Sequence, residues 1–169
     1  VDFSRFEQTN SNNENENYIV YTGSLSNKKD GTLYLLEAMK EITAKHENLK
    51  LKIAGGKNHE IERLRSYVQE NGMEQNVYFL GLINSNEIPP LLLNSKILVL
   101  PRPDSLQARG GFPTKLGEDL ATGKPVIVTR VGEIPKYLTY NDVYFIDPKN
   151  IKEELIAKID YLNWGRKYV

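Results

Sequence analysis

The segment YIVYTGSLSNKKDGTLYLLEAMKEITAKHENLKLKIA, residues 18–54, decides the fold. It opens with apolar and aromatic residues that predict a short buried strand, which ends at Gly23. Residues 32–45 predict a helix because their apolar side chains recur at helical spacing, at Leu35, Leu36, Met39 and Ile42. Residues 49–54 alternate apolar and polar side chains, as a second strand does. A strand, a helix and a strand in this order predict a parallel βαβ unit.

The same alternation continues toward the C-terminus. Further strands are expected at residues 77–80, 97–100, 125–129 and 143–146. Helices are expected at residues 59–71, 87–94, 113–122, 134–138 and 151–162. Short strands that alternate with helices are typical of a parallel sheet covered on both faces. We therefore expect an α/β fold, a Rossmann-like, doubly wound and mainly parallel six-stranded sheet with helices on both faces.

The N-terminal segment differs from the rest of the chain. Residues 10–17 read N-S-N-N-E-N-E-N, and such a polar run has nothing to bury. We therefore expect residues 1–17 to be a linker remnant and flexible segment. Residues 18–169 are expected to form one Rossmann-like domain, since no second domain is visible in the sequence.

Composition excludes several classes of protein. Lysine plus arginine equals aspartate plus glutamate, 22 each, and this neutral balance argues against a general nucleic-acid binder. The absence of cysteine excludes disulfides, cysteine zinc sites and thiol nucleophiles. There is no D-x-D motif and no carboxylate cluster suited to magnesium, so we expect no metal site. No apolar run approaches the ~20 residues of a membrane span, and no signal peptide opens the chain.

The most informative stretch for function is GGFPTKLGEDLATGKPV, residues 110–126. In doubly wound sheets the ligand lies beyond the carboxyl ends of the strands, where this stretch is expected. Gly110 and Gly111 lead into a helix whose first turn has unpaired backbone N–H groups and a partial positive charge. Thr114 adds a hydroxyl donor and Lys115 a full positive charge. This arrangement predicts a site for a phosphate or diphosphate.

Glu118 follows Thr114 by one helical turn and has core-like neighbours. A carboxylate at the edge of a core needs partners, and two ribose hydroxyls suit it. The alternatives are that Glu118 pairs with Lys115 or points to water. The sequence leaves these three roles open.

The loop of residues 23–31 is a second candidate for phosphate binding, because it follows the first strand and precedes a helix. It is neither G-x-G-x-x-G nor a Walker loop, and Lys28 and Lys29 also fit simple solvated loop charges. A nucleotide-cofactor oxidoreductase or epimerase would need G-x-G-x-x-G here and an acidic residue at the end of the second strand. That strand ends at Ala54 with two glycines after it, which argues against this class.

An ordered set of short motifs runs through the chain. VDFSRF at residues 1–6 is similar to V-D-x-x-x-F, residues 23–25 correspond to G-R-L, and residues 77–81 read V-x-F-L-G. Residues 101–125 are similar to the variant F-P-S-K-x-x-E-Y-L-A-x-G-x-P-V, and residues 131–135 to V-G-G-I-P. With this set the chain resembles the C-terminal, donor-binding domain of GT-B-fold, retaining glycosyltransferases of family 4 (group 1). The resemblance covers essentially the whole chain.

The resemblance implies roles for individual residues. Glu118 occupies the second glutamate of the E-x7-E motif, which holds the ribose of the donor, while Thr114 and Lys115 meet its diphosphate. The remaining donor-binding positions lie along the base, across the crevice from the phosphates and at the start of the helix: Gly81, Leu82 and Ile83; Gly23, Ser24 and Lys29; Gly110, Gly111 and Phe112.

Two positions depart from the family pattern. The first glutamate of E-x7-E falls on Gly110, and Gln107 and Arg109 are the candidates to replace it. The basic residue of G-R-L is Ser24, and Lys28 or Lys29 can supply the missing charge.

The implied function is that of a donor-binding domain of a retaining glycosyltransferase, which moves a sugar from a nucleoside-diphosphate-sugar to an acceptor hydroxyl. Lys115 and Glu118 are the expected catalytic residues, with no metal and no cofactor beyond the donor. The resemblance implies an absent N-terminal acceptor-binding domain, so we expect the chain alone to be inactive. Its setting would be cytoplasmic bacterial surface-polysaccharide synthesis at the inner face of the membrane, with peripheral membrane association open. The alternative is a non-catalytic nucleotide-binding or assembly module.

Overall fold

The computed structural model describes residues 2–7, 9 and 16–165. Its strands form one six-stranded sheet in which every pair is parallel, in the order β3-β2-β1-β4-β5-β6. The strands are β1 (Tyr18–Gly23), β2 (Lys50–Gly55), β3 (Val77–Gly81), β4 (Ile97–Leu100), β5 (Val126–Thr129) and β6 (Tyr144–Ile146). The order reverses between β1 and β4, which is the topological switch point of a doubly wound sheet. The predicted fold class is therefore confirmed.

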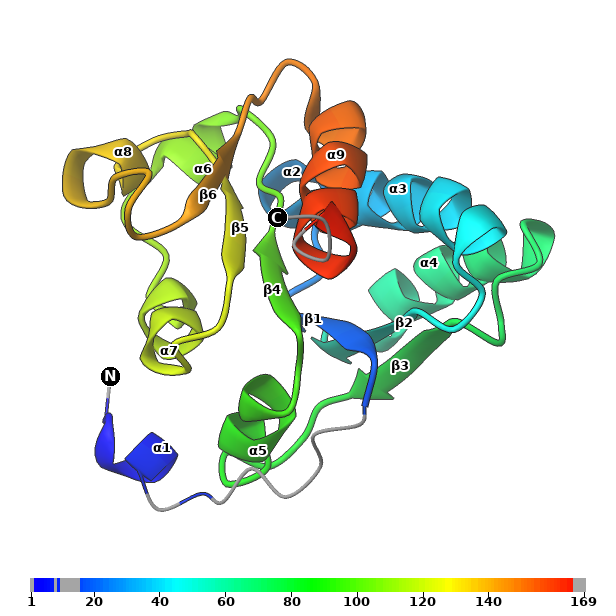
Figure 1. Cartoon of the computed structure of the whole chain (residues 1–169), viewed down its shortest axis with the longest axis horizontal. Coiled ribbons are helices and arrows are strands. Elements are labelled where there is room, and N and C mark those ends of the chain that lie inside the picture. The colour runs from blue at the N-terminus through cyan, green and yellow to red at the C-terminus, as the bar shows by residue number, and fades with distance from the viewer. Residues whose placement is uncertain (1, 8, 10–15, 166–169) are drawn as a thin grey trace.

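Nine helices connect or flank the strands within the described residues. The long ones are α3 (Thr32–Lys45), α4 (Asn58–Glu70) and α9 (Ile151–Asn163). The short ones are α1 (Ser4–Glu7), α2 (Asn27–Asp30), α5 (Ile88–Leu93), α6 (Leu106–Arg109), α7 (Lys115–Ala121) and α8 (Ile134–Tyr137). Figure 1 shows α9 beside α3 on one side of the sheet and α5 and α7 on the other. None of the helices in this part of the chain is long and apolar enough to cross a membrane.

The core lies on both faces of the central strands. Every residue of β4 and β5 is buried, which explains why these strands appear in the sequence as continuous apolar runs. The edge strand β3 instead alternates buried and more exposed residues, with Tyr78 and Leu80 outside. Fully burying one large apolar side chain contributes about 1.5–3 kcal/mol, so the central strands hold the sheet together.

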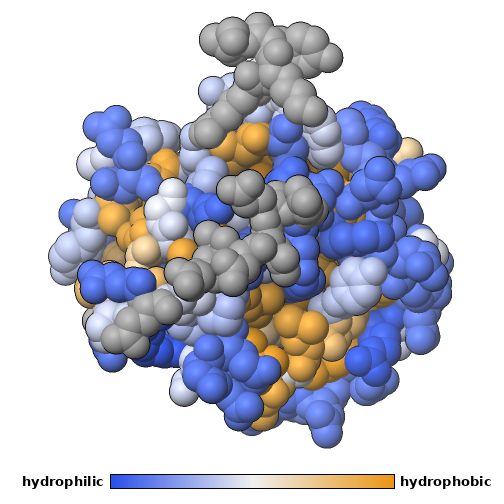
Figure 2. Space-filling view, turned by 60° about the horizontal axis from the view of Figure 1, so that its bottom comes forward, coloured by the Kyte–Doolittle hydropathy of each residue, from blue (hydrophilic) through white to orange (hydrophobic). Residues whose placement is uncertain are grey.

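The N-terminal segment packs on the domain. α1 lies against α5, and its Phe6 is buried. Figure 2 turns this end of the molecule toward the viewer and shows hydrophilic residues over much of the face, with apolar residues in separate patches. Most of the predicted linker, residues 10–15, lies outside the described residues.

One glycine fixes the loops at the switch point. Gly31 joins α2 to α3 in a left-handed conformation, with φ +64°. A Cβ atom there would overlap the carbonyl oxygen of Pro101, which follows β4. Because glycine alone fits both requirements, the loops after β1 and β4 approach each other closely at this point.

Candidate functional site

The loops that follow β1, β2 and β3 surround a cavity of about 890 Å³ at the carboxyl edge of the sheet. Four predicted donor-binding residues line it, namely Gly23, Ser24, Gly81 and Leu82. Gly81 adopts φ +66° with no atom near the position of a Cβ, and Leu82 is 87% exposed. The cavity therefore presents open backbone and an apolar side chain to a ligand. Ile83 and Lys29 do not line this cavity, and Lys29 is exposed on α2.

A second cavity, of about 680 Å³, lies at the loops after β4 and β5. It is lined by the predicted residues Gly111 and Phe112 together with Glu133 and Tyr137, which sequence reasoning did not select. The rings of Phe112 and Tyr137 meet edge to face, with their centroids 5.6 Å apart. Six of the predicted donor-binding residues thus line one or the other of these two cavities, and the rest, Lys29, Ile83, Gly110, Thr114, Lys115 and Glu118, line neither.

The loop that leads into α7 contains four free backbone donors, which are interrupted at Gly111 and Pro113. Within the described chain, no acceptor is present for the N–H groups of Gly110, Phe112, Thr114 and Lys115. Gly111 adopts φ +101° with open space beside it. The Gly111 N–H donates to the Arg109 carbonyl at 3.0 Å and Pro113 has no N–H, so only the free donors of Thr114 and Lys115 are consecutive. Free N–H groups gathered in a turn can form a concave anion site. We call residues 110–115 the anion loop.

The helix after the anion loop is shorter than predicted. The sequence predicts a start at Pro113, but the helix extends from Lys115 to Ala121, seven residues. The N–H groups of Leu116 and Gly117 donate to the carbonyls of Pro113 and Thr114, at 3.0 and 3.2 Å. A helix of this length adds little dipole, so the free N–H groups of the loop carry the attraction for an anion.

The side chain of Lys115 points into the interior. Its ammonium nitrogen is buried, makes no hydrogen bond within the described residues, and lies 4.3 Å from the centre of the Tyr21 ring. Burial lowers the pKa of Lys115, and the carboxylates of Asp119 and Asp30 oppose this change. Burial also raises the pKa of Asp119 to about 6, against the attraction of Lys115. The charge of Lys115 is therefore held beneath the anion loop and does not reach out of it.

Two further charged residues lie in the same interior region. Arg102 is 5% exposed, and burial lowers its pKa while Asp30 and Tyr21 oppose the change. Asp30 is 2% exposed and accepts hydrogen bonds from the Ser24 hydroxyl and, at 3.0 Å, from the Ser26 N–H. Burial and the Asp30 carboxylate raise the pKa of Tyr21. Sequence reasoning missed Asp30 and Arg102, whose only signal was their position beside Gly31 and Pro101.

Four buried ionic groups therefore share this region, and we call them the buried charge cluster: Asp30, Arg102, Lys115 and Asp119. Two acids and two bases balance one another. Buried charges are tolerated when opposite charges or hydrogen bonds compensate them.

Glu118 has a partner that none of the sequence alternatives named. Arg5 of α1 lies 3.3 Å from its Oε1, and the same guanidinium donates to the carbonyl of Ser85 in the loop after β3. The Glu118 and Arg5 side chains are 27% and 31% exposed. Arg5 thus joins the N-terminal segment to both sides of the predicted nucleoside site. The only sequence signal for this contact was its position within V-D-x-x-x-F.

Metal ligands do not gather in the structure. Within residues 2–7, 9 and 16–165, no group of three or more His, Asp or Glu side chains is placed to hold a metal ion. The site therefore presents backbone N–H groups, glycines, Glu118 and buried cations.

These features define the class of the protein. A parallel sheet whose order reverses between β1 and β4, with glycine loops at that edge, is a Rossmann-like domain that receives ligands at its switch point. A family model described as Glycosyl transferases group 1 matches residues 2–166, and the chain belongs to this family. Its sheet is the C-terminal half of a GT-B fold.

Solved structures share this fold at low sequence identity. Anabaena HepE, solved with UDP and glucose, is 18% identical with a TM-score of 0.79, over 99% of this chain and 46% of HepE. The C-terminal domain of LpcC from Francisella tularensis is 22% identical with a TM-score of 0.78, over 99% of this chain and 89% of that one. The pneumococcal O-GlcNAc transferase GtfA, solved with UDP and GlcNAc, is 19% identical with a TM-score of 0.75, over 94% of this chain and 31% of GtfA. A search of curated proteins found no match. This chain spans less than half of HepE.

Proposed function

We propose that this chain is the donor-binding domain of a retaining glycosyltransferase that transfers a sugar from a nucleoside-diphosphate-sugar to an acceptor hydroxyl. The observation that carries the proposal is the anion loop, whose last two free backbone N–H groups, on Thr114 and Lys115, lie about one helical turn before Glu118. Family membership and the UDP bound in HepE and GtfA support the same reading. Each of those proteins binds UDP in a structure whose fold this chain shares.

The difficult step of such a transfer is departure of the diphosphate with its growing negative charge. The N–H groups of Gly110, Phe112, Thr114 and Lys115 are fixed before the reaction, so they stabilise that charge without reorganising. Lys115 acts from below, because a buried ammonium exerts a stronger field than one in water. In this proposal no metal ion is needed. The bond between the anomeric carbon and the diphosphate oxygen breaks, and the acceptor oxygen bonds to that carbon on the same face, so the configuration is retained. The proton of the acceptor hydroxyl passes to the departing diphosphate.

The nucleoside is held by different groups. Glu118 accepts hydrogen bonds from two ribose hydroxyls, and it does so next to the guanidinium of Arg5. The base lies along Gly81 and Leu82, which line the first cavity, and the backbone at Gly81 is open. Ile83 follows them in the chain and does not line the cavity. This division predicts that losing the Glu118 carboxylate affects nucleosides more than inorganic anions.

The proposal includes a partner and a setting. A chain that spans less than half of HepE would bind the donor, and a preceding domain would bring the acceptor. We place the full-length enzyme in surface-polysaccharide synthesis in the bacterial cytoplasm, at the inner face of the membrane. The second candidate is a non-catalytic nucleotide-binding module. Because this chain spans less than half of HepE, that candidate applies only to the isolated chain.

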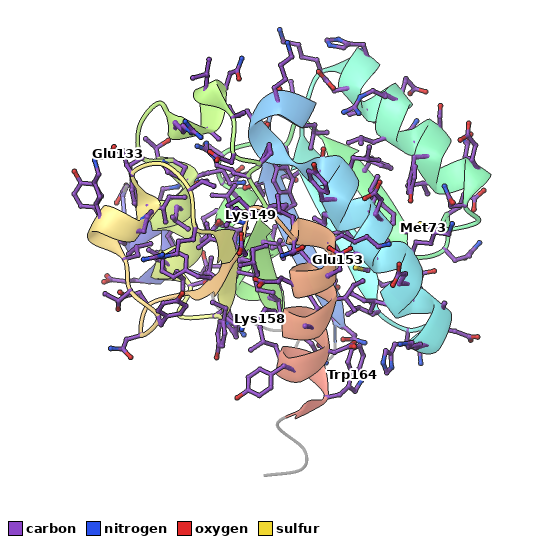
Figure 3. The ribbon with its side chains drawn as sticks, turned by 90° about the horizontal axis from the view of Figure 1, so that it is seen from above. Met73, Glu133, Lys149, Glu153, Lys158 and Trp164 are labelled. Atoms are coloured by element: carbon purple, nitrogen blue, oxygen red, sulfur yellow. The ribbon has the colours of Figure 1, made fainter. Side chains whose placement is uncertain are left out.

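Calorimetric titration of the 169-residue chain with UDP, GDP, ADP, CMP and pyrophosphate tests the proposal. We expect selective binding of one nucleoside diphosphate. Glu118→Gln should weaken the binding of that nucleotide by about tenfold, which is the effect of losing one charge-assisted hydrogen bond. The binding of pyrophosphate should not change. Glu153→Gln is the matched control, because Glu153 is exposed on α9 (Figure 3). Failure of the wild type to bind any of these ligands would refute the donor site.

A further inference from the structure

The second cavity combines a carboxylate with two aromatic rings. Glu133 and Tyr137 come from α8 and the residue before it, and Gly111 and Phe112 come from the anion loop. Figure 3 shows Glu133 beside α8, well away from the labelled residues of α9. A lining of aromatic rings with one convergent polar group is typical of a small-molecule site. The anion loop also borders this cavity, which places it next to the proposed diphosphate site.

The loop that carries Glu133 is fixed against the end of α6. Gly132 adopts φ +57°, and a Cβ atom there would lie 2.9 Å from the Ala108 carbonyl oxygen and 3.1 Å from the Arg109 Cα. Such a close approach leaves no room for a side chain at residue 132. The backbone before Glu133 therefore lies directly beside the residues that lead into Gly110.

The Glu133 carboxylate has capacity to accept further hydrogen bonds. Its Oε1 accepts from the Lys136 ammonium at 2.8 Å, the single partner that it has among the described side chains. A carboxylate offers about four acceptor positions on its two oxygens. The side chain is 34% exposed, so a ligand can reach it. Hydroxyl groups are its natural donors, because the Lys136 ammonium already neutralises part of the charge of the Glu133 carboxylate.

The rings supply the complementary surface. Phe112 is 36% exposed and Tyr137 is 68% exposed, although they pack edge to face with each other. Aromatic rings give a rigid apolar surface on which a ligand can rest its C–H groups. A sugar ring has both features at once, with hydroxyls at its rim and C–H groups on its face.

The two candidates for replacing the glutamate absent at Gly110 do not fit this role. Arg109 is held by Asp104 through two hydrogen bonds of 2.7 and 2.9 Å. Gln107 is exposed and does not line the cavity. Glu133 stands where the V-G-G-I-P pattern has its second glycine. The chain therefore has a glycine where the pattern has a glutamate, and a glutamate where it has a glycine. Glu133 lines the cavity, and Gly110 directly precedes Gly111, which lines it too.

We propose that Glu133 binds hydroxyl groups of the donor sugar, with Phe112 and Tyr137 packed against the sugar ring. In the family pattern the carboxylate for the sugar comes from the loop after β4. In this chain it would come from the loop after β5. This inference rests on the proposed function, because the sugar is that of the same donor. It makes Glu133 a residue that determines which sugar the site accepts.

Calorimetry with matched pairs of ligands tests this inference on the whole chain. UDP is compared with UDP-glucose, and GDP with GDP-mannose, on the wild type and on Glu133→Gln. We expect the variant to bind the matching sugar nucleotide about ten- to a hundredfold more weakly while it binds the free diphosphate as the wild type does. Tyr137→Ala should show the same selective loss. Tyr140→Ala is its control, because Tyr140 is equally exposed but lines a different cavity.

The outcomes separate this inference from the proposed function. If the wild type binds a diphosphate and Glu133→Gln binds both members of the pair normally, the inference is overturned and the donor site stands. If Glu133→Gln weakens the binding of the free diphosphate and of the sugar nucleotide equally, Glu133 acts on the diphosphate, and its proposed role in binding the sugar is overturned. If the wild type binds none of these four ligands and none of ADP, CMP and pyrophosphate, the proposed donor site fails together with the inference. Thermal unfolding of each variant verifies that it is folded.

Discussion

Replacing Asp119 with asparagine should remove a pH dependence that burial builds into the domain. Asp119 is 3% exposed, and burial raises its pKa from 3.8 to about 6 despite the attraction of Lys115. A carboxyl group whose pKa is raised on folding is favoured in its neutral form. Its contribution to stability is therefore fully present below pH 3.8 and is lost as the pH rises through 6.

The magnitude follows from the size of the shift. A rise of about two pKa units corresponds to about 3 kcal/mol between the fully protonated and fully ionised limits. Between pH 7 and pH 5 most folded molecules but few unfolded ones take up the proton, which gives a gain of about 1 kcal/mol. The free energy of unfolding of the wild type should thus rise by about 1 kcal/mol, relative to that of Asp119→Asn, when the pH falls from 7 to 5.

Urea denaturation at pH 5, 6 and 7, followed by circular dichroism, measures this difference. The remaining ionisable groups are common to both proteins, so their contributions cancel in the difference. Asp142→Asn is the control, because Asp142 is exposed and its hydrogen bonds with Thr139 lower its pKa. Its ionisation therefore changes little between pH 5 and 7. A constant difference between wild type and Asp119→Asn over this range would refute the assigned environment of Asp119.

Three further predictions concern neighbouring features. Arg5→Ala should lower the free energy of unfolding by less than about 1 kcal/mol, since its ion pair with Glu118 is partly exposed, and 1 M NaCl should shrink the effect. Gly31→Ala should destabilise the domain by at least about 1 kcal/mol more than Gly72→Ala in thermal unfolding, since both glycines have similar positive φ but only Gly31 meets another backbone. Lys115→Met should weaken the binding of pyrophosphate and of nucleoside diphosphates alike, by about tenfold in calorimetry, because a buried charge acts on any anion in the loop. Unchanged pyrophosphate binding would contradict that role.

The sequence predicted most of the sheet because its central strands are buried on both faces. Residues 97–100 were expected as a strand and form β4, and residues 125–129 form β5 from Val126. Continuous apolar runs of this length, bounded by turn residues, are typical of strands in a covered parallel sheet. α1 was not predicted, since a single turn has no periodicity and depends on Phe6 packing at α5. α7 begins later than expected because Pro113 and Thr114 form a turn before it.

The sequence indicated which loops form the candidate site but not which side chains contact one another there. The glycines before a helix indicated the loop of residues 110–115 as a candidate anion site, since backbone chemistry is local. The contact of Arg5 with Glu118 spans 113 positions in the sequence, and nothing local reports it. The inward direction of Lys115 was missed for a different reason. Lysine is rarely buried, so an exposed charge was the natural expectation at that position.

The buried charge cluster explains how a site can lack a basic residue in the loop after β1. Ser24 stands at the basic position of that loop, and its hydroxyl donates to Asp30 rather than facing outward unpaired. In the proposed function Arg102 and Lys115 would supply positive charge from the interior, where Asp30 and Asp119 compensate the burial of these cations. An anion in the loop would attract both buried cations without touching them. Because the buried cluster holds two acids against two bases, in the proposed function the loop would select its ligand mainly by shape and backbone donors.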